Sequence, residues 1–130
     1  NDMLVPFDEE NDKRTYTFTN IWNNSVYYHG NVPNNEFKLY KKVTIVLGKS
    51  VSSKESFRFT LGKSDYMKIS NISLKKGDKI VYDGVQTWRN GTPINHRCTN
   101  AQPKFYPGWN DFAFNQQVKS VTFDMKFYYK

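Results

Sequence analysis

The chain has 130 residues, 17% of them aromatic, and its 19 Lys and Arg against 12 Asp and Glu give a formal net charge of +7. This length suits one compact domain with a single core, which large aromatic side chains can fill without disulfide bonds. The single cysteine, Cys98, excludes an intrachain disulfide and therefore a disulfide-stapled secreted mini-domain. We expect Cys98 to be a buried or half-buried residue rather than a reactive thiol.

Residues 1–14 are predicted to form a polar lead-in, ahead of a single β-sandwich domain over 15–130. Asp8, Glu9, Glu10 and Asp12 lie close together in this lead-in. Their spacing does not match an EF-hand loop, which requires a glycine at its sixth position. A solvated acidic tail is therefore favoured over a calcium site.

Apolar and polar residues alternate along most of the remaining chain, with the period of two that is typical of half-buried β-strands. The clearest case is the end of the chain, where Val121, Phe123, Met125, Phe127 and Tyr129 share one face. The aromatic inner face of this last strand suits a central or well-covered position. The expected strands span 16–22, 26–29, 37–47, 57–61, 66–74, 79–85, 112–114 and 118–129.

Turn signals separate these segments. A turn is expected at 23–25, and another over 75–78. Asn90-Gly91 is the favoured pair for a type I′ hairpin turn. The side of the apolar residues changes between Ile69 and Ile72, which predicts a bulge near Asn71.

Seven to nine short strands with little helix predict an all-β fold, and specifically an antiparallel β-sandwich that is jelly-roll-like. The sequence holds no apolar stretch of 18 residues, so no transmembrane segment is predicted. No signal peptide precedes Asn1, and a chain that opens at this residue suggests a processed product. We therefore expect a secreted or cell-surface protein.

The patterns that would indicate catalysis, a cofactor or a metal are incomplete. His96 and Cys98 are two ligands without a third, so no zinc-type site is predicted. No motif places a base beside a Ser or Cys nucleophile, and the pair Asp83 and Asp111 has nothing but its acidity to suggest glycoside hydrolysis. The sequence is therefore interpreted as that of a non-catalytic protein without a cofactor.

Strand alternation is lost between Trp88 and Asp111, a segment with two of the three Trp and three of the five Pro. Long irregular loops on rigid β-scaffolds commonly carry function. Aromatic rings stack on the apolar faces of sugars, while amides, guanidinium groups and carboxylates bind the hydroxyls. We therefore predict a lectin-like, carbohydrate-binding module that recognises a glycan or a cell-surface receptor. The predicted ligand-binding residues are Trp88, Arg89, Asn95, Tyr106, Trp109, Asn110 and Asp111. The competing interpretation is that Trp88, Phe105 and Trp109 fold back as a lid over the core.

The alternative function is that of a toxin, adhesin or immune-evasion module that docks a host protein or an anionic membrane. It rests on the net charge of +7, which favours anionic partners. Lys38, Lys42, Arg58 and Lys68 are expected on the outward faces of neighbouring strands and would form a basic sheet face. Nucleic-acid binding is disfavoured, because Tyr40 alone interleaves these cations with a ring.

Overall fold

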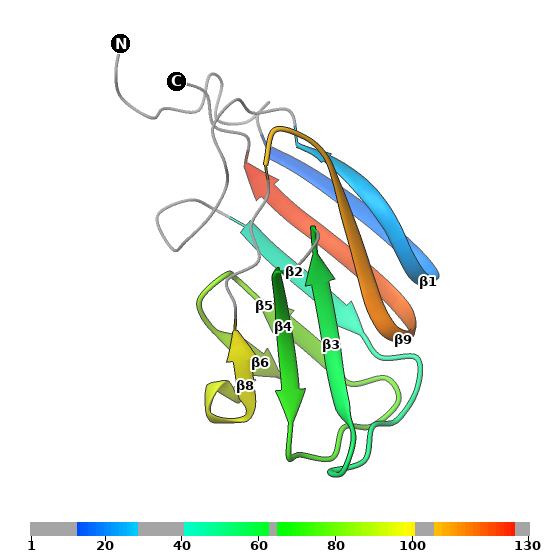
Figure 1. Ribbon diagram of the computed structural model, residues 1–130, viewed down its shortest axis with the longest axis vertical. Coiled ribbons are helices and arrows are strands. Elements are labelled where there is room, and N and C mark those ends of the chain that lie inside the picture. Colours follow the sequence, from blue (N-terminus) through cyan, green and yellow to red (C-terminus); the bar gives the residue numbers. More distant parts are fainter. Residues whose placement is uncertain (1–12, 29–40, 63–64, 101–105, 127–130) are drawn as a thin grey trace.

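The computed structural model describes residues 13–28, 41–62, 65–100 and 106–126, and Figure 1 shows their arrangement. Within these ranges the chain is almost entirely β-structure, with nine strands and one short 3₁₀ helix. In the described part of the chain, no helix has the length and apolarity needed to cross a bilayer. The elements are β1 (Lys13–Tyr28), β2 (Lys41–Val46), β3 (Ser56–Leu61), β4 (Asp65–Ser70), β5 (Lys79–Tyr82), β6 (Thr87–Arg89), β7 (Thr92–Pro93), η1 (Asn95–Arg97), β8 (Cys98–Asn100) and β9 (Gly108–Lys126).

The strands form one antiparallel sheet in the order β7-β6-β5-β2-β9-β3-β4-β8, and β1 pairs with β9 outside this path. The sheet curls into the shape of a half-barrel (Figure 1). The prediction of an antiparallel all-β fold with little helix is confirmed, as is the central position of the last strand. The arrangement as a sandwich or jelly roll stays a prediction.

Strands β1 and β9 form a long two-stranded ribbon that turns a sharp corner. Ile21 pairs with Val118 whereas Asn23 pairs with Ala113, so Trp22 alone lies opposite residues 114–117. Unequal numbers of residues on paired strands bend a ribbon, as in a β-bulge. Figure 1 shows β9 descending to this corner and returning from it. Consequently β9 pairs with β3 before the corner and with β2 after it.

This corner corrects the prediction of a turn at 23–25. The Asn-rich segment does not end a strand, because its backbone continues to pair with β9 from Asn23 to Tyr28. The corner lies just before this segment, at Trp22, and Asn20 two residues earlier takes a positive φ of 51°. Asn tolerates this conformation better than other residues that carry a Cβ.

The core is lined by alternate residues of the strands, as the sequence pattern predicted. Phe57, Phe59 and Leu61 of β3 are buried. The ring centroid of Phe59 lies 6.4 Å from that of Tyr82 on β5 and 6.3 Å from that of Phe123 on β9. Rings from distant parts of the sheet order therefore meet in one core. Val121 and Met125 are buried with Phe123, while Phe127 and Tyr129 lie outside the described residues.

Two turn predictions can be compared with the backbone. Asn90 and Gly91 have φ values of 49° and 87° and join the pair Arg89 and Thr92, as expected for a type I′ turn. Asn71 has a φ of 61° and lies just after β4. It therefore ends the strand expected over 66–74 instead of forming a bulge within it, and Leu74 pairs with Val51 in an isolated bridge.

Several predicted boundaries change. Residues 1–12 and 37–40 lie outside the described residues, and Lys13 and Arg14, assigned to the lead-in, belong to β1. The strand expected over 79–85 ends at Tyr82. The segment from Trp88 to Asp111 is not one irregular loop, because β6, β7, η1, β8 and the start of β9 lie in it. Three of these strands have only two or three residues, which is too short for alternation to be recognised.

Candidate functional site

The structure divides the seven predicted site residues between two regions. Trp88 and Arg89 lie on β6 and Asn95 lies on η1. Tyr106 precedes β9, which contains Trp109, Asn110 and Asp111. Strands β5 and β2 separate β6 from β9 in the sheet. The structure therefore places Trp88, Arg89 and Asn95 on elements that are not sheet neighbours of the segment with Tyr106, Trp109, Asn110 and Asp111.

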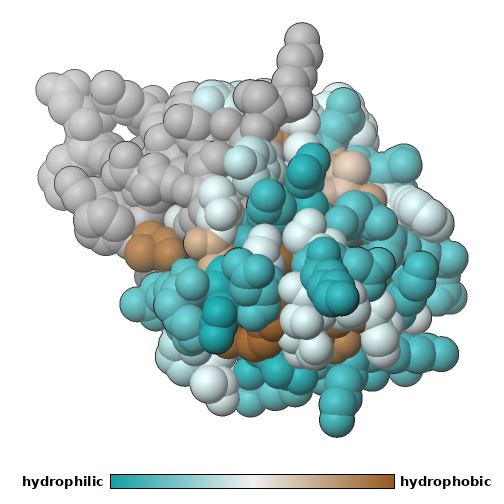
Figure 2. All heavy atoms as spheres, turned by 60° about the horizontal axis from the view of Figure 1, so that its bottom comes forward, coloured by the Kyte–Doolittle hydropathy of each residue, from teal (hydrophilic) through white to brown (hydrophobic). Residues whose placement is uncertain are grey.

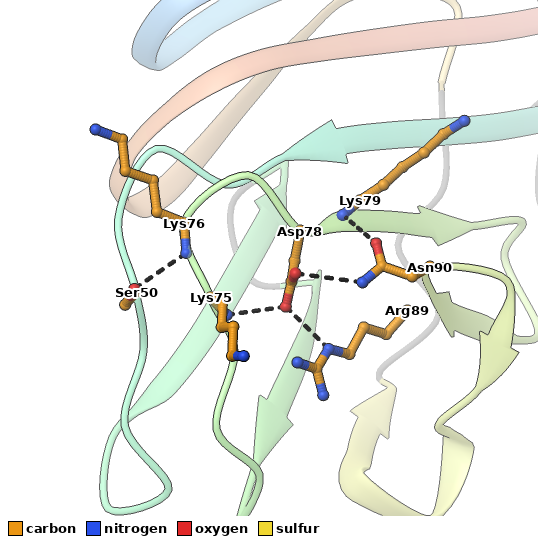
Figure 3. A network of polar contacts seen from close by, with 7 residues as sticks. All are labelled: Ser50, Lys75, Lys76, Asp78, Lys79, Arg89 and Asn90. Carbon is orange, nitrogen blue, oxygen red and sulfur yellow. Dashed lines mark hydrogen bonds and ion pairs between the residues drawn. The ribbon is translucent and has the colours of Figure 1, made fainter.

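Arg89 holds a buried carboxylate in a polar network at the turn before β5 (Figure 3). Its Nε donates to Oδ2 of Asp78 at 2.9 Å, and only 11% of the Asp78 side chain is exposed. The same carboxylate accepts hydrogen bonds from the backbone N–H of Lys75 at 2.8 Å and from Nδ2 of Asn90 at 3.2 Å. Asn90 in turn accepts from the backbone N–H of Lys79 at 2.9 Å. Arg89 thus joins the hairpin of β6 and β7 to the start of β5.

The ionisation of Asp78 reflects this network. Burial raises the pKa of the carboxyl, but the hydrogen bonds from Lys75, Asn90 and Arg89, together with the attraction of Arg89, outweigh burial and hold the pKa below its ordinary value. The charged form is therefore the one that the folded state stabilises.

Trp88 and Asn95 also contribute to local structure. Trp88 is half-buried on β6, between its cross-strand neighbours Val81 and Pro93. Oδ1 of Asn95 accepts a hydrogen bond from the backbone N–H of Thr87 at 2.7 Å. The backbone N–H of Ile94 donates to the carbonyl of Thr87 at 2.9 Å. Two hydrogen bonds with Thr87 therefore connect the start of η1 with β6.

Asn110 shapes the backbone that presents Trp109. It is 5% exposed, and its Oδ1 accepts from the backbone N–H of Tyr106 at 2.8 Å. Its Nδ2 donates to the carbonyls of Tyr106 and Gly108 at 2.8 and 3.0 Å. Gly108 has a φ of 96°, a conformation that favours glycine. All polar atoms of this amide are therefore engaged within the turn, and none is left for a ligand.

Trp109 is the most exposed large hydrophobic residue described, with 72% of its surface accessible. It lies opposite Tyr27 of β1, and the two rings meet edge to face with centroids 5.2 Å apart. This edge-to-face geometry is favourable for aromatic pairs. Tyr106, 48% exposed, lies just before β9.

Polar side chains follow Tyr27 and Trp109 along the same outer side of the β1–β9 ribbon. Ser25 lies opposite Asp111, and its hydroxyl donates to Oδ1 of that carboxylate. Asn23 lies opposite Ala113 one step further along. We call the surface of Asn23, Ser25, Tyr27, Trp109 and Asp111 the ribbon face. An open depression of about 640 Å³ adjoins one end of this face. Its lining includes Asn23, Ser25 and Asp111 of the ribbon face, together with Asn24, Gly62, Phe112 and Ala113.

The β1 half of the ribbon face was missed by sequence reasoning. Ser25 and Asp111 are 86 positions apart, so no local pattern connects them. The alternation of Val26 and Tyr28 as buried residues could have assigned Ser25 and Tyr27 to the outer side of a strand. It could not have identified β9 as the partner.

The described residues contain no group of three His, Cys, Asp or Glu side chains that could hold a metal ion. Cys98 is half-buried, as expected, and its thiol donates to the carbonyl of Ile94 at 3.3 Å. Burial raises the pKa of this thiol, against a smaller lowering effect of a hydrogen bond with Thr87. Asp83 accepts from the backbone N–H groups of Val85 and Gln86 and so closes a turn.

The predicted basic sheet face is only partly assembled. Arg58 and Lys68 are cross-strand neighbours on β3 and β4, and the Arg58 guanidinium lies 5.5 Å from the ring centroid of Tyr66. Lys42 is on β2 opposite Asp124, and β9 separates β2 from β3. Lys38 and Tyr40 lie outside the described residues.

Comparison of the sequence with protein-family models and with curated proteins gave no match.

Proposed function

We propose that this protein is a non-catalytic carbohydrate-binding domain of a secreted or cell-surface protein, and that the ribbon face binds the sugar. The observation that carries the proposal is the position of Trp109. Trp109 is 72% exposed on the long strand β9, and its ring packs edge to face against Tyr27. The next cross-strand pair on the same side of the ribbon is Ser25 and Asp111, which brings a carboxylate to this face. A ligand that covers an exposed ring of this size removes apolar surface from water, which is favourable, so such rings commonly mark binding sites.

The ribbon face has the two kinds of group that sugars require. The indole face of Trp109 covers the apolar face of a pyranose ring, since aromatic rings contribute large contact area at a low cost in conformational entropy. Asp111 accepts hydrogen bonds from sugar hydroxyls through the oxygen that Ser25 does not engage. The amide of Asn23 can both donate and accept. Oδ1 of Asn24 accepts a hydrogen bond from the backbone N–H of Ser25 at 2.8 Å, so this amide would serve the sugar as a donor. The depression beside them accommodates a second sugar residue.

The proposed site keeps Trp109 and Asp111 from the sequence prediction and adds four residues of β1, Asn23, Asn24, Ser25 and Tyr27. Asn110 positions the turn, and Tyr106 precedes the ring on the same turn. Trp88, Arg89 and Asn95 are assigned to the structural network around β6. For the fold, we propose that the two arms of the curled sheet act as the layers of a jelly-roll-like sandwich, since Phe59 and Tyr82 contact each other across the core.

A glycan array of neutral oligosaccharides, followed by titration calorimetry with the strongest binder, tests the proposal. Trp109→Ala is expected to lower the affinity about tenfold or more, as truncation of an aromatic anchor does. Trp22→Ala is the matched control, because Trp22 is also exposed, at 54%, but lies at the corner of the ribbon. Absence of any binder on the array, or equal affinities for wild type and Trp109→Ala, would contradict the proposal.

The alternative, docking to a host protein or an anionic membrane, rests on the net charge of +7 and has no continuous basic face among the described strands to support it. Co-sedimentation with anionic liposomes at low and high salt distinguishes it, because attraction between exposed charges is screened by salt. Salt-sensitive pelleting would favour the alternative, and no pelleting would favour the carbohydrate proposal.

A further inference from the structure

A second open depression, of about 650 Å³, lies at the corner of the β1–β9 ribbon. Trp22 is part of its lining and is 54% exposed. Trp22 is also the residue that stands alone opposite the longer segment of β9, so the bend of the ribbon places it there. This depression shares no lining residue with the depression beside the ribbon face.

The wall of the depression is built from contacts that hold its shape. Gln116 is 7% exposed; its Oε1 accepts from the backbone N–H of Lys49 at 3.0 Å, and its Nε2 donates to the carbonyl of Lys49 at 3.1 Å. Gln117 donates to the carbonyl of Asn20 at 3.1 Å. A Cβ added at Gly48 would lie 2.3 Å from the carbonyl oxygen of Gln117, so this close approach of two backbones requires glycine.

Three lysines from three segments border this depression: Lys49 after β2, Lys76 before β5 and Lys119 on β9. All three are exposed. The backbone N–H of Lys76 is fixed by Oγ of Ser50 at 3.0 Å, and Figure 3 shows its side chain pointing away from the carboxylate of Asp78. Within the described ranges, none of the three ammonium groups forms a hydrogen bond or a close ion pair.

Lys49 also attracts a carboxylate outside the depression, that of Glu55. The pKa of Glu55 is lowered mainly by two hydrogen bonds, the larger effect coming from the backbone N–H of Ser52 and the next from the side chain of Ser52. The attraction of Lys49 lowers this pKa by a smaller amount. Glu55 is therefore held mainly by Ser52. The described lining of the depression holds three lysines and no Asp or Glu, so its charge is positive.

We propose that the corner depression is a binding site for an acidic saccharide, a sugar ring that carries a carboxylate, sulfate or phosphate. The indole of Trp22 would cover the ring, while Lys49, Lys76 and Lys119 would bind its anionic groups. Single-stranded nucleic acid fits less well, because successive bases need successive stacking rings and Trp22 is the one aromatic residue of the described lining. Figure 2 shows a largely hydrophilic surface with small separate apolar patches at the end of the molecule that it brings forward.

Titration calorimetry with an oligogalacturonate and a heparin-derived oligosaccharide, against a neutral maltooligosaccharide of equal length, tests this inference. We expect the acidic probes to bind with a salt-sensitive affinity and the neutral probe not to bind at this site. Trp22→Ala is expected to weaken binding about tenfold or more. Lys76→Gln and Lys119→Gln are each expected to weaken it about two- to fivefold, as loss of one exposed ion pair does.

Two variants serve as controls. Lys54→Gln removes an exposed lysine outside the depression, and Trp109→Ala removes the exposed ring of the ribbon face; both are expected to bind the acidic probes like wild type. Equal losses in Lys54→Gln and Lys76→Gln would overturn the inference in favour of general charge attraction. A tighter complex with an oligothymidylate that needs the same residues would overturn it in favour of nucleic acid. No binding of either acidic probe would also overturn it, and would leave the Trp109 proposal intact.

Discussion

If Arg89 stabilises the fold through Asp78, replacing either residue lowers stability without affecting sugar binding at the ribbon face. Asp78→Asn removes the negative charge of the carboxylate. It also replaces one acceptor oxygen with an amide N–H₂ group, which then faces the N–H donors of Lys75, Arg89 or Asn90. Arg89→Ala leaves the carboxylate with two of the three hydrogen bonds that it accepts, those from the backbone N–H of Lys75 and from Nδ2 of Asn90. The carboxylate substitution is therefore expected to cost more than the arginine substitution.

The expected magnitudes follow from exposure and partners. Hydrogen bonds that involve a charged group contribute about 1.5–3 kcal/mol each, and a buried group without its partner costs about 1–3 kcal/mol. Because 26% of the Arg89 side chain is exposed against 11% for Asp78, water replaces part of the arginine's interactions. We expect Arg89→Ala to lower the free energy of unfolding by about 1–2 kcal/mol and Asp78→Asn by about 2–4 kcal/mol.

Urea denaturation followed by circular dichroism measures both values, and Asp124→Asn is the matched control. Asp124 accepts a hydrogen bond from the hydroxyl of Thr15 at an exposed position, and asparagine can accept the same bond. The control is therefore expected to stay within about 0.5 kcal/mol of wild type. An Asp78→Asn protein as stable as the control would refute this account of the network.

The pH dependence gives an independent check. Since the pKa of Asp78 is lowered in the folded state, its ionisation stabilises the fold above the ordinary aspartate pKa of about 3.9, and this contribution is lost as pH falls through the folded value. The stability difference between wild type and Asp78→Asn is expected to be constant near neutral pH and to shrink in acid. A difference that grows in acid would contradict the assignment.

Two further predictions concern the corner and the thiol. Gly48→Ala is expected to destabilise the protein by about 1–3 kcal/mol, because its Cβ would collide with the backbone of Gln117; urea denaturation against Ser53→Ala measures this, and equal stabilities would refute the close approach. Cys98 is expected to react with Ellman's reagent about tenfold or more slowly in the folded than in the urea-unfolded protein, because burial raises its pKa. Equal rates would show an accessible thiol.

Local alternation predicted the strands whose buried residues lie two positions apart. Phe57, Phe59 and Leu61 were assigned to the core because burial on one side of a strand depends on neighbours in sequence. The pairing of Ser25 with Asp111 was not predictable in this way, since contacts across 86 positions leave no periodic signal. The Asn-rich stretch of β1 was therefore interpreted as a turn and excluded from the site.

Composition alone selects candidate site residues by chemical type, without information on their neighbours in the fold. Trp109 and Asp111 were selected for their chemical types, and both lie on the ribbon face. The same argument selects Arg89 and Asn110. In the structure, however, Arg89 binds Asp78, and Asn110 closes the turn that begins at Tyr106. Residue types that bind sugars also satisfy buried backbone groups, and only the three-dimensional neighbours distinguish the two uses.

Binding of a sugar at the ribbon face is tested most directly by a nitrogen–proton correlation spectrum. It is recorded during titration with the neutral oligosaccharide that binds best on the array. The chain has three tryptophans, and Trp→Phe substitutions assign their indole N–H signals to Trp22, Trp88 and Trp109. The Trp109 signal is expected to shift as the sugar is added, while the Trp88 and Trp22 signals stay in place. A shift of the Trp88 signal with an unchanged Trp109 signal would contradict the assignment of the ribbon face.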